Sequence, residues 1–305
     1  MICTLYSVLC TPLWAQTSML SIGVRGGGQM MLPTAVAGMT GTMSATFGGA
    51  GALDLRYTFY GEPTDRIDIG FAVSAGVGYG SAGIQGTRTD TYTNLDYKGN
   101  ALDYTCTAQY SQTDRFAKAD AALLLAMRFS GVTINIGPRF MLPFAATGTV
   151  TISEASIDAY YPAYNVHVRD QLITGKLETP YTENRPSNIS KYHLLVAAEI
   201  GYEWRMTNQH ALGVQLFAEA AVWSKQSPVT NNQSPLIGVS PITDASNPVP
   251  VVTIGSVESF VAHRRYLDFG IRVYYAFSVS KDRGYKSHFN SRKDTRLHRN
   301  RILIF

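Results

Sequence analysis

Residues 66–83, RIDIGFAVSAGVGYGSAG, alternate between two kinds of side chain. One register is small or polar and includes Asp68, Ser74 and Gly78. The other register is apolar and consists of Ile67, Ile69, Phe71, Val73, Ala75, Val77 and Tyr79. A period of two predicts a strand, because alternate strand residues face opposite sides of a sheet. Strands of soluble sheets usually hold about 5–6 residues, so this length favours a tilted strand that crosses a bilayer.

Seven further segments show the same alternation. In the last of them the apolar register runs from Leu267 to Val279, while Asp268 and Arg272 lie on the other register. Residues 116–129 also fit an amphipathic helix by composition, and we assign them to a strand from their alternation. We therefore predict eight strands, at residues 18–30, 46–60, 66–83, 116–129, 132–144, 192–205, 212–222 and 267–279.

The connections between these strands alternate in length. The turns after the second, fourth and sixth strands are short, whereas the next connections span residues 84–115, 145–190 and 224–264. A soluble sandwich gives no reason for this alternation, but outer-membrane barrels have short periplasmic turns, long extracellular loops and an even number of strands. The sequence therefore predicts an all-β fold, an eight-stranded antiparallel up-and-down transmembrane β-barrel in the cell outer membrane of a Gram-negative organism.

The composition favours a membrane barrel and divides the chain. Only 16% of the residues are charged, and there is no run of 18 apolar residues to form a transmembrane helix. Residues 280–305 hold eight Lys/Arg and two Asp/Glu, so the basic balance belongs to the tail and gives the barrel no nucleic-acid footprint. We predict a signal peptide at 1–15, although it has no basic n-region and a buried first strand is the alternative. The barrel then spans 16–280, and a basic, disordered periplasmic tail spans 281–305.

Aromatic residues gather at the ends of the predicted strands. An amphipathic ring is favoured at the level of the lipid headgroups, so we expect two aromatic belts at the two membrane interfaces. Near the short turns the belt residues are Tyr57, Phe59, Phe129, Tyr202, Trp204 and Phe277. Near the long loops they are Tyr79, Phe116, Phe144, Tyr192 and Trp223. A general preference of aromatic residues for strands does not explain why they cluster at both ends.

With this pattern the chain resembles the small eight-stranded outer-membrane barrels, the OmpA-like transmembrane domain and its relatives, and especially those of Bacteroidota. The segments that carry the resemblance are HLLVAAEIGYEWRM at 193–206, HALGVQLFAEAAVW at 210–223 and LDFGIRVYYAFSV at 267–279. In that family a periplasmic peptidoglycan-binding domain often follows the barrel. The tail of 26 residues is too short for such a domain, so the resemblance here implies a barrel without it.

The charged residues of the strands lie opposite the apolar register and are expected to face the lumen. An Arg or Lys that faces lipid at the midplane costs about 2–4 kcal/mol, and an eight-stranded barrel is just wide enough for side chains to fill its interior. We therefore expect an ion-pair network that plugs the lumen. Its predicted members are Asp54, Arg56, Asp68, Lys118, Asp120, Arg128, Arg139, Glu199, Glu203, Glu219, Asp268 and Arg272. Arg205 lies on the same register and is also expected to face inward. The alternative is a narrow small-solute pore, for which Arg139 and Arg272 are the residues to test.

Two histidines near the extracellular rim are the candidates for catalysis. His193 lies close to Ser190, and His263 lies just before the last strand. Neither is accompanied by a set of nucleophile, base and orienting group, and no Cys/His spacing indicates a metal site. We therefore expect no enzyme and no cofactor, while a rim-located lipid-modifying or proteolytic enzyme is the third functional alternative.

The long loops are the expected place for specific binding, because binding sites commonly lie on loops that a rigid scaffold holds. The aromatic segment DAYYPAY at 158–164 either contacts a ligand or host surface or packs over the barrel mouth. We expect a monomeric structural or surface-interaction scaffold in contact with outer-membrane lipid and lipopolysaccharide. Any surface ligand would bind through loops 84–115, 145–190 and 224–264, and no nucleic acid is expected as a partner.

Overall fold

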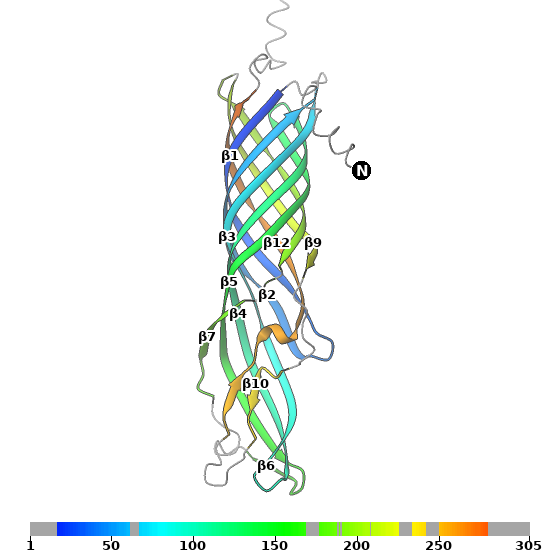
Figure 1. Cartoon of the computed structure of the whole chain (residues 1–305), viewed down its shortest axis with the longest axis vertical. Coiled ribbons are helices and arrows are strands. Elements are labelled where there is room, and N and C mark those ends of the chain that lie inside the picture. Colours follow the sequence, from blue (N-terminus) through cyan, green and yellow to red (C-terminus); the bar gives the residue numbers. More distant parts are fainter. Residues whose placement is uncertain are drawn as a thin grey trace, which may run out of the picture.

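The computed structural model describes residues 17–61, 67–168, 177–187, 189, 191–207, 209–225, 234–241 and 250–279. The described chain forms a tall cylinder of tilted strands, and part of the sheet continues well beyond one end of the cylinder (Figure 1). The predicted signal peptide and the predicted basic tail lie outside the described residues. The described residues contain no helix that is long and apolar enough to cross a membrane.

Eight long strands form a closed ring. In order around the ring they are β1 (Thr17–Ala35), β2 (Thr40–Tyr60), β3 (Asp68–Leu95), β4 (Ala101–Phe129), β5 (Val132–Tyr161), β8 (Tyr192–Arg205), β9 (His210–Lys225) and β12 (Val261–Ser278). Each strand pairs antiparallel with the next, and β12 pairs with β1. Closure leaves no unpaired sheet edge in the bilayer, where an unsatisfied backbone group would be costly. The predicted eight-stranded antiparallel barrel is confirmed.

Short connections lie at the end of the ring where β1 begins and β12 ends. Between β4 and β5 the turn is Ser130-Gly131, and both residues have positive φ, 48° and 90°. Such a two-residue turn matches the twist of the paired strands, and glycine adopts this backbone without a clash of its own side chain. The connection from β8 to β9 spans residues 206–209. This end of the ring is therefore the periplasmic end.

Two of the predicted long loops are largely strand, and this corrects the sequence prediction. β3 continues to Leu95 and β4 starts at Ala101, so the predicted loop 84–115 is mostly a hairpin. In the same way, β5 continues to Tyr161 within the predicted loop 145–190. The physical reason is a second alternation in residues 101–111, where the even positions are apolar or aromatic and the odd positions are mainly Thr, Asp, Gln and Ser. The strand pattern therefore persists outside the membrane with its polarity reversed.

On the extracellular side of the membrane, at the bottom of Figure 1, β3, β4 and β5 form a twisted sheet that projects from the barrel. Two short strands, β6 (Val166–Val168) and β7 (Tyr181–Pro186), pair with β5 in this part of the molecule. The third predicted loop also contains regular structure: β10 (Ile237–Val239), β11 (Val252–Ile254) and the 3-10 helix η2 (Val257–Phe260). We call residues 84–115, 145–168, 177–187 and 234–260, where described, the extracellular extension.

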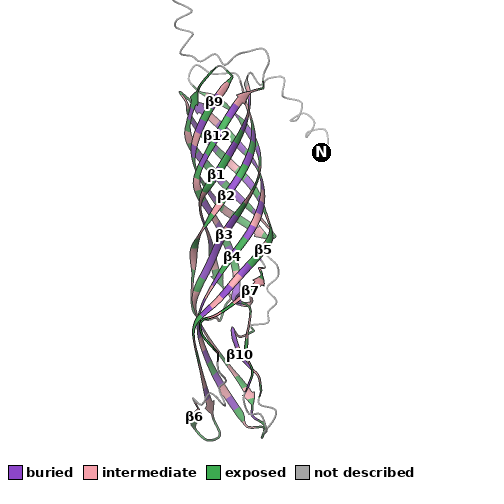
Figure 2. Ribbon diagram, turned by 90° about the vertical axis from the view of Figure 1, so that its left-hand side faces the viewer, coloured by how far each residue is buried: buried purple, intermediate pink, exposed green. Residues whose placement is uncertain are grey.

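The extracellular extension has an apolar core of its own. β10, β11 and η2 pack against the inner face of the projecting sheet (Figures 1 and 2). Side chains hold β10 in place: Asp90 accepts a hydrogen bond from the Leu236 amide at 2.7 Å, and the Tyr92 hydroxyl accepts one from the Val239 amide at 2.6 Å. The buried core residues include Ile84, Leu102, Tyr104, Cys106, Ala108, Tyr110, Val150, Ile152, Val257 and Phe260.

The outer surface of the ring carries a broad band of apolar side chains. Outward side chains on neighbouring strands, such as Val24, Leu53, Val77 and Leu123, are each more than half exposed. A continuous apolar surface of this extent marks an interaction with an apolar environment, and an outward apolar band is the hallmark of transmembrane barrels. The chain is therefore a protein of the cell outer membrane.

The ten aromatic residues predicted for the belts, Phe116 apart, are exposed or half-buried on this outward surface. Some of them pack on one another: the ring centroids of Tyr202 and Trp204 are 5.1 Å apart, and those of Tyr192 and Trp223 are 5.3 Å apart. Phe116 differs, because it is fully buried inside the ring. Its expected place in the belt is wrong, since an even position of β4 faces inward.

Candidate functional site

The twelve charged residues predicted for the lumen lie on the inward register of the ring, and all except Asp68 are buried. Arg205 was also expected to face inward, but it is exposed, because it is the last residue of β8. They take this register because the opposite one must face lipid with apolar side chains. A buried charge is strongly unfavourable unless it is paired and hydrogen-bonded. The arrangement of partners therefore decides whether this interior is stable.

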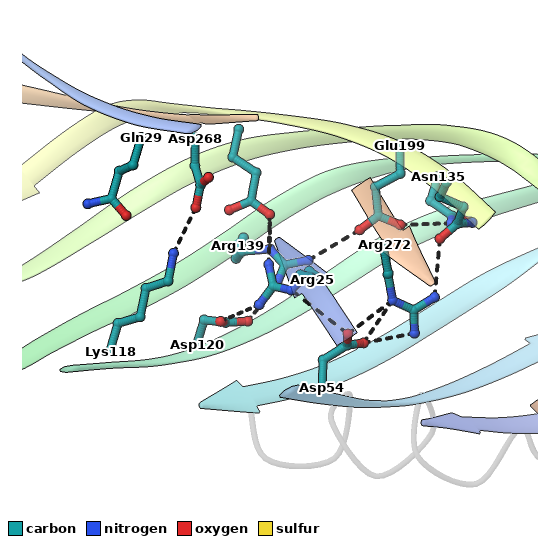
Figure 3. Close-up of polar contacts among 12 residues, drawn as sticks. Arg25, Gln29, Asp54, Lys118, Asp120, Asn135, Arg139, Glu199, Asp268 and Arg272 are labelled. Atoms are coloured by element: carbon teal, nitrogen blue, oxygen red, sulfur yellow. Dashed lines mark hydrogen bonds and ion pairs between the residues drawn. The ribbon is translucent and has the colours of Figure 1, made fainter. Parts of the chain in front are cut away.

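Asp120 of β4 lies between two arginines, Arg25 of β1 and Arg139 of β5 (Figure 3). Both guanidinium groups donate hydrogen bonds to its carboxylate. Glu219 of β9 lies 3.0 Å from each of the same two arginines. These four residues, which we call the central quartet, connect four strands in a closed cycle of alternating charge across the lumen.

Glu199 of β8 joins a second group of side chains to the central quartet. Arg56 donates to both of its carboxylate oxygens, at 2.6 and 2.7 Å, in the bidentate geometry that makes such pairs strong. Asn135 donates to the same carboxylate at 3.0 Å, and Arg139 donates to it at 3.3 Å (Figure 3). The carboxylate of Glu199 thus receives hydrogen bonds from three side chains and is held firmly in the interior.

Arg272 of β12 binds Asp54 of β2 through two guanidinium nitrogens, Nε at 3.0 Å and Nη2 at 2.8 Å (Figure 3). It also donates to the Ser21 hydroxyl and to the Gln215 side-chain oxygen, each at 3.2 Å. Gly23 provides the space, because a Cβ at this position would lie 2.9 Å from Asp54 and 3.0 Å from Arg272. The small inward residues of the strands therefore make room for the large charged ones.

Lys118 forms the layer of the lumen closest to the extracellular side of the central quartet. Its Nζ donates to Asp268 at 2.7 Å and to the Tyr266 hydroxyl at 2.8 Å. Tyr266 in turn donates to the Gln29 side-chain oxygen at 2.8 Å. A Cβ at Gly80 would lie only 2.3 Å from that oxygen, so the glycine leaves room for the Gln29 side chain.

Arg128 occupies the periplasmic mouth of the lumen. It donates to Asp68 at 2.9 Å, lies 3.6 Å from Glu203 and stacks over the ring of Tyr60 with 4.4 Å between the guanidinium carbon and the ring centroid. Tyr274 donates to Glu203 at 3.2 Å. Arg128 therefore pairs with two carboxylates at this end of the lumen, as the arginines of the interior do.

The charges between the mouth and the extracellular rim balance. The cations are Arg25, Arg56, Lys118, Arg139 and Arg272, and the carboxylates are Asp54, Asp120, Glu199, Glu219 and Asp268. We call these ten residues the lumen network. Between it and the mouth lies a small cavity with a volume of about 20 Å³ for the centre of a water molecule. This volume is enough for about one water molecule. The side chains of the lumen network therefore leave room for about one water molecule on their periplasmic side.

An apolar layer covers the lumen network on its extracellular side. Each of its main side chains is at most 1% exposed: Met31, Phe116, Met141, Leu195 and Tyr266. Above this layer, Arg264 donates to Asp114 at 2.6 Å. A path for water or ions through the barrel would have to displace the apolar layer as well as the lumen network.

The sequence prediction missed several members of this interior. Arg25 is in the central quartet but was not among the predicted lumen residues, because the glycines at 26–28 weaken the strand pattern around it. Its position opposite Ile22 and Val24 is the signal that identifies it. Gln29 and Gln215 carry no charge, so a search for charged residues cannot find them.

The two rim histidines have different surroundings. His193 is buried, and its Nδ1 lies 2.6 Å from the Ser224 hydroxyl oxygen. Its Nε2 has no hydrogen-bond partner among the described residues, so no carboxylate there orients the ring. Ser190 lies outside the described residues, and His263 is exposed on the outer face of β12. The structure joins a serine to a histidine but not the third member of a catalytic set.

The predicted aromatic segment 158–164 lies at the far end of the extracellular extension. Tyr161 packs against Tyr164 with ring centroids 5.9 Å apart, and its hydroxyl donates to Asp96 at 3.5 Å. Tyr164 is 62% exposed, and Tyr97 on the adjacent β3–β4 turn is 49% exposed. The rings of Tyr97 and Tyr164 therefore face outward at the tip, while Tyr161 is held to the β3–β4 turn through Asp96.

Asp96 fixes the backbone of the β3–β4 turn. Its Oδ1 accepts hydrogen bonds from the amides of Lys98 and Asn100, each at 2.8 Å, and its Oδ2 accepts one from the Asn100 side chain at 3.0 Å. Burial acts in the opposite direction, but these hydrogen bonds lower the pKa of Asp96 below its ordinary value. The carboxylate of Asp96 therefore holds the turn that presents Tyr97 through three hydrogen bonds.

No protein family and no curated protein matches the chain. Among solved structures it is similar to Ail, the attachment invasion locus protein of Yersinia pestis, in complex with the heparin analogue sucrose octasulfate, with 7% identity, a TM-score of 0.28 and coverage of 86% of this chain and 100% of that one. It is also similar to the outer membrane protease OmpT of Escherichia coli, with 9% identity, a TM-score of 0.24 and coverage of 87% and 97%. A third match is the translocator domain of the autotransporter NalP of Neisseria meningitidis, with 7% identity, a TM-score of 0.18 and coverage of 90% of this chain and 94% of that one.

Matches at this level assign no ligand and no activity to this chain, and the eight-stranded ring rests on the strand pairing described above. They do correct one expectation. We expected no enzyme, but OmpT is itself a protease, so the exclusion of catalysis is withdrawn. The likeness to OmpA-like barrels and to those of Bacteroidota stays a prediction.

Proposed function

We propose that this outer-membrane barrel is a surface-interaction scaffold with a charge-plugged lumen. The observation that carries the proposal is the uninterrupted passage of β3, β4 and β5 from the ring into the extracellular extension. A barrel that only spans the membrane needs no such projection, because the ring closes without it. The extension holds its own apolar core and presents exposed tyrosines at its tip, and rigid aromatic rings are favoured contact residues in protein recognition.

The test of this proposal uses the two exposed tip tyrosines. The double variant Tyr97→Ser and Tyr164→Ser, reconstituted in nanodiscs, is compared with the wild-type protein for binding to an immobilised panel of polysaccharides and host extracellular proteins. Loss of a contact tyrosine typically costs more than about 1 kcal/mol, so we expect the double variant to lose about tenfold or more in affinity. The matched control, Gln109→Ser on the side of the extension, keeps its affinity. Equal binding by all three proteins would refute the role of the tip.

The lumen network supports a scaffold in preference to a narrow pore. Its five cations and five carboxylates are buried and paired, and the apolar layer around Phe116 lies above them. In planar bilayers we therefore expect no single-channel steps from the folded protein in concentrated KCl. Steps that depend on Arg139 or Arg272 would favour the pore instead.

A further inference from the structure

Two arginines from different strands line the small cavity between the lumen network and the periplasmic mouth. Arg56 of β2 and Arg272 of β12 both contribute to its wall. Their carboxylate partners, Glu199 and Asp54, are not among the described residues that line it. The charges that balance when the whole lumen network is counted therefore do not balance at this wall.

The two guanidinium groups converge on one neutral acceptor. Arg56 donates through Nη1 to the side-chain oxygen of Gln215 at 3.4 Å, and Arg272 donates through Nη1 to the same oxygen at 3.2 Å. The Gln215 amide nitrogen donates to the Thr133 hydroxyl at 3.0 Å, which turns the oxygen toward the arginines. Like charges repel strongly in a buried site, where water and salt screen them little. An anion beside them would offset this repulsion more than a neutral oxygen does.

The wall of the cavity holds more hydrogen-bond donors than free acceptors. Arg56 is 3% exposed, and its Nε has no hydrogen-bond partner among the described residues. Glu203 is the one carboxylate among the described lining residues. It accepts a hydrogen bond from Tyr274 at 3.2 Å and lies 3.6 Å from Arg128, so other groups already neutralise it. A buried donor without an acceptor is unfavourable, so the wall favours an occupant that accepts hydrogen bonds.

We propose that this cavity binds a single monatomic anion, chloride. The two guanidinium groups attract an anion and repel a metal cation, and the hydroxyl groups of Thr58 and Thr133 line the same wall. The space that admits one water molecule also admits a chloride ion, which is only slightly larger, but not the four oxygens of sulfate or phosphate. The site lies inside the lumen, so it is independent of the tip tyrosines and of the surface-interaction proposal.

The experiment locates the anion in crystals of the full chain soaked in sodium bromide, because bromide replaces chloride and scatters anomalously. We expect one anomalous peak in the cavity, beside Arg56 and Arg272. Gln215→Glu places a carboxylate where both arginines already donate, so it supplies the negative charge itself and is expected to abolish the peak. Thr58→Met fills the cavity with a larger side chain without a change of charge and is also expected to abolish it.

A second measurement asks whether the anion binds strongly enough to matter in solution. A ligand that binds only the folded protein stabilises it increasingly as its concentration rises. We therefore expect the urea midpoint of the wild type in lipid vesicles to rise with chloride concentration. Sodium sulfate at equal ionic strength reports the general effect of salt on stability. The rise specific to chloride is expected to disappear in Gln215→Glu and in Thr58→Met.

Thr105→Glu is the matched control, because it adds the same charge on the exposed outer face of the extension. This variant is expected to keep both the peak and the chloride effect, and heat-modifiable migration on a gel shows that each variant is folded. A wild-type cavity without an anomalous peak would overturn the proposal, since the cavity would then hold water. A peak without any chloride-specific rise in the urea midpoint would identify an adventitious ion only and would overturn it too.

Discussion

The two halves of β4 differ in what they bury, although they belong to one continuous strand. Even-numbered residues face inward from Leu102 to Arg128. In the membrane these inward residues include Lys118 and Asp120, and the outward ones are alanine, leucine, methionine and phenylalanine. In the extracellular extension the inward residues include Tyr104, and the outward ones are mainly Thr, Asp, Gln and Ser.

The surrounding medium therefore sets the polarity of each face of β4, while the strand conformation sets only the alternation. Lipid accepts apolar side chains and excludes charges, so the membrane half turns its charges inward and must pair them. Water accepts hydroxyl and carboxylate groups, so the extracellular half buries its apolar side chains as a soluble protein does. The hydrophobic effect stabilises the extension, whereas ion pairing offsets the cost of burying charges inside the ring.

The largest expected effect follows from removal of one charge of the central quartet. Asp120→Ala removes one of the two carboxylates that Arg25 and Arg139 share, and breaking a buried pair costs about 3–5 kcal/mol. Urea unfolding of the barrel in lipid vesicles measures this loss. The control Leu123→Ala, on the outward register of the same strand, is expected to cost about 2 kcal/mol. An equal loss for both would contradict the paired interior.

A charge placed on the outward register tests the two environments directly. Leu123→Arg puts the charge in the bilayer and is expected to lower the free energy of unfolding by about 2–4 kcal/mol. Thr105→Arg puts the same charge on the same face of β4 in water, where a surface substitution changes stability by about 0.5 kcal/mol or less. Urea unfolding of both variants measures the difference, and a large loss for Thr105→Arg would show that residue 105 does not face water.

A cavity in the extension core tests whether the two halves are stabilised separately. Ile152 is fully buried in that core, so Ile152→Ala is expected to cost about 2–5 kcal/mol. The loss is expected in the extension alone, seen as faster amide hydrogen exchange in residues 101–111 and 147–152. The ring should still migrate as a folded, heat-modifiable barrel. Faster exchange throughout the ring would mean that the two halves unfold together.

The smallest effect concerns the Cys106 thiol in the extension. Burial raises its pKa from about 9.0 to about 11. A pKa raised by folding gives stability that is complete below about pH 9 and is lost as the pH rises toward 11. Thiolate absorbance is expected to rise near pH 11 in the folded protein and near pH 9 in urea, with Cys106→Ala as the blank. A folded midpoint near pH 9 would show that the thiol is exposed.

Alternation and connection lengths were enough to predict the ring. All eight strands of the closed ring overlap predicted segments, and the twelve predicted charged residues lie on the inward register, because lipid forces a strict separation of apolar and charged faces. The extension was missed for the same reason. Residues 101–111 alternate with reversed polarity, and a search for apolar residues on the lipid side interprets such a stretch as a polar loop.

Individual interior contacts were less accessible to sequence reasoning. The even register of Lys118 and Asp120 extends back to Phe116, so counting along β4 would have placed this ring inside, whereas its nearness to a loop indicated the belt. The partners of each charge depend on how far neighbouring strands shift along one another. Asp120 meets Arg25 across 95 positions of sequence, and that pairing follows from the closed ring and not from any local pattern.

The most direct test is a scan of β4 with single cysteines carrying spin labels, in a background that lacks the native cysteines. In reconstituted vesicles, collisions with oxygen report contact with lipid, and collisions with a water-soluble nickel complex report contact with water. We expect odd positions from 117 to 129 to meet oxygen, odd positions from 101 to 115 to meet the nickel complex, and even positions to meet neither. Access of the nickel complex to even positions between 118 and 128 would contradict the paired interior, because the lumen would then hold water.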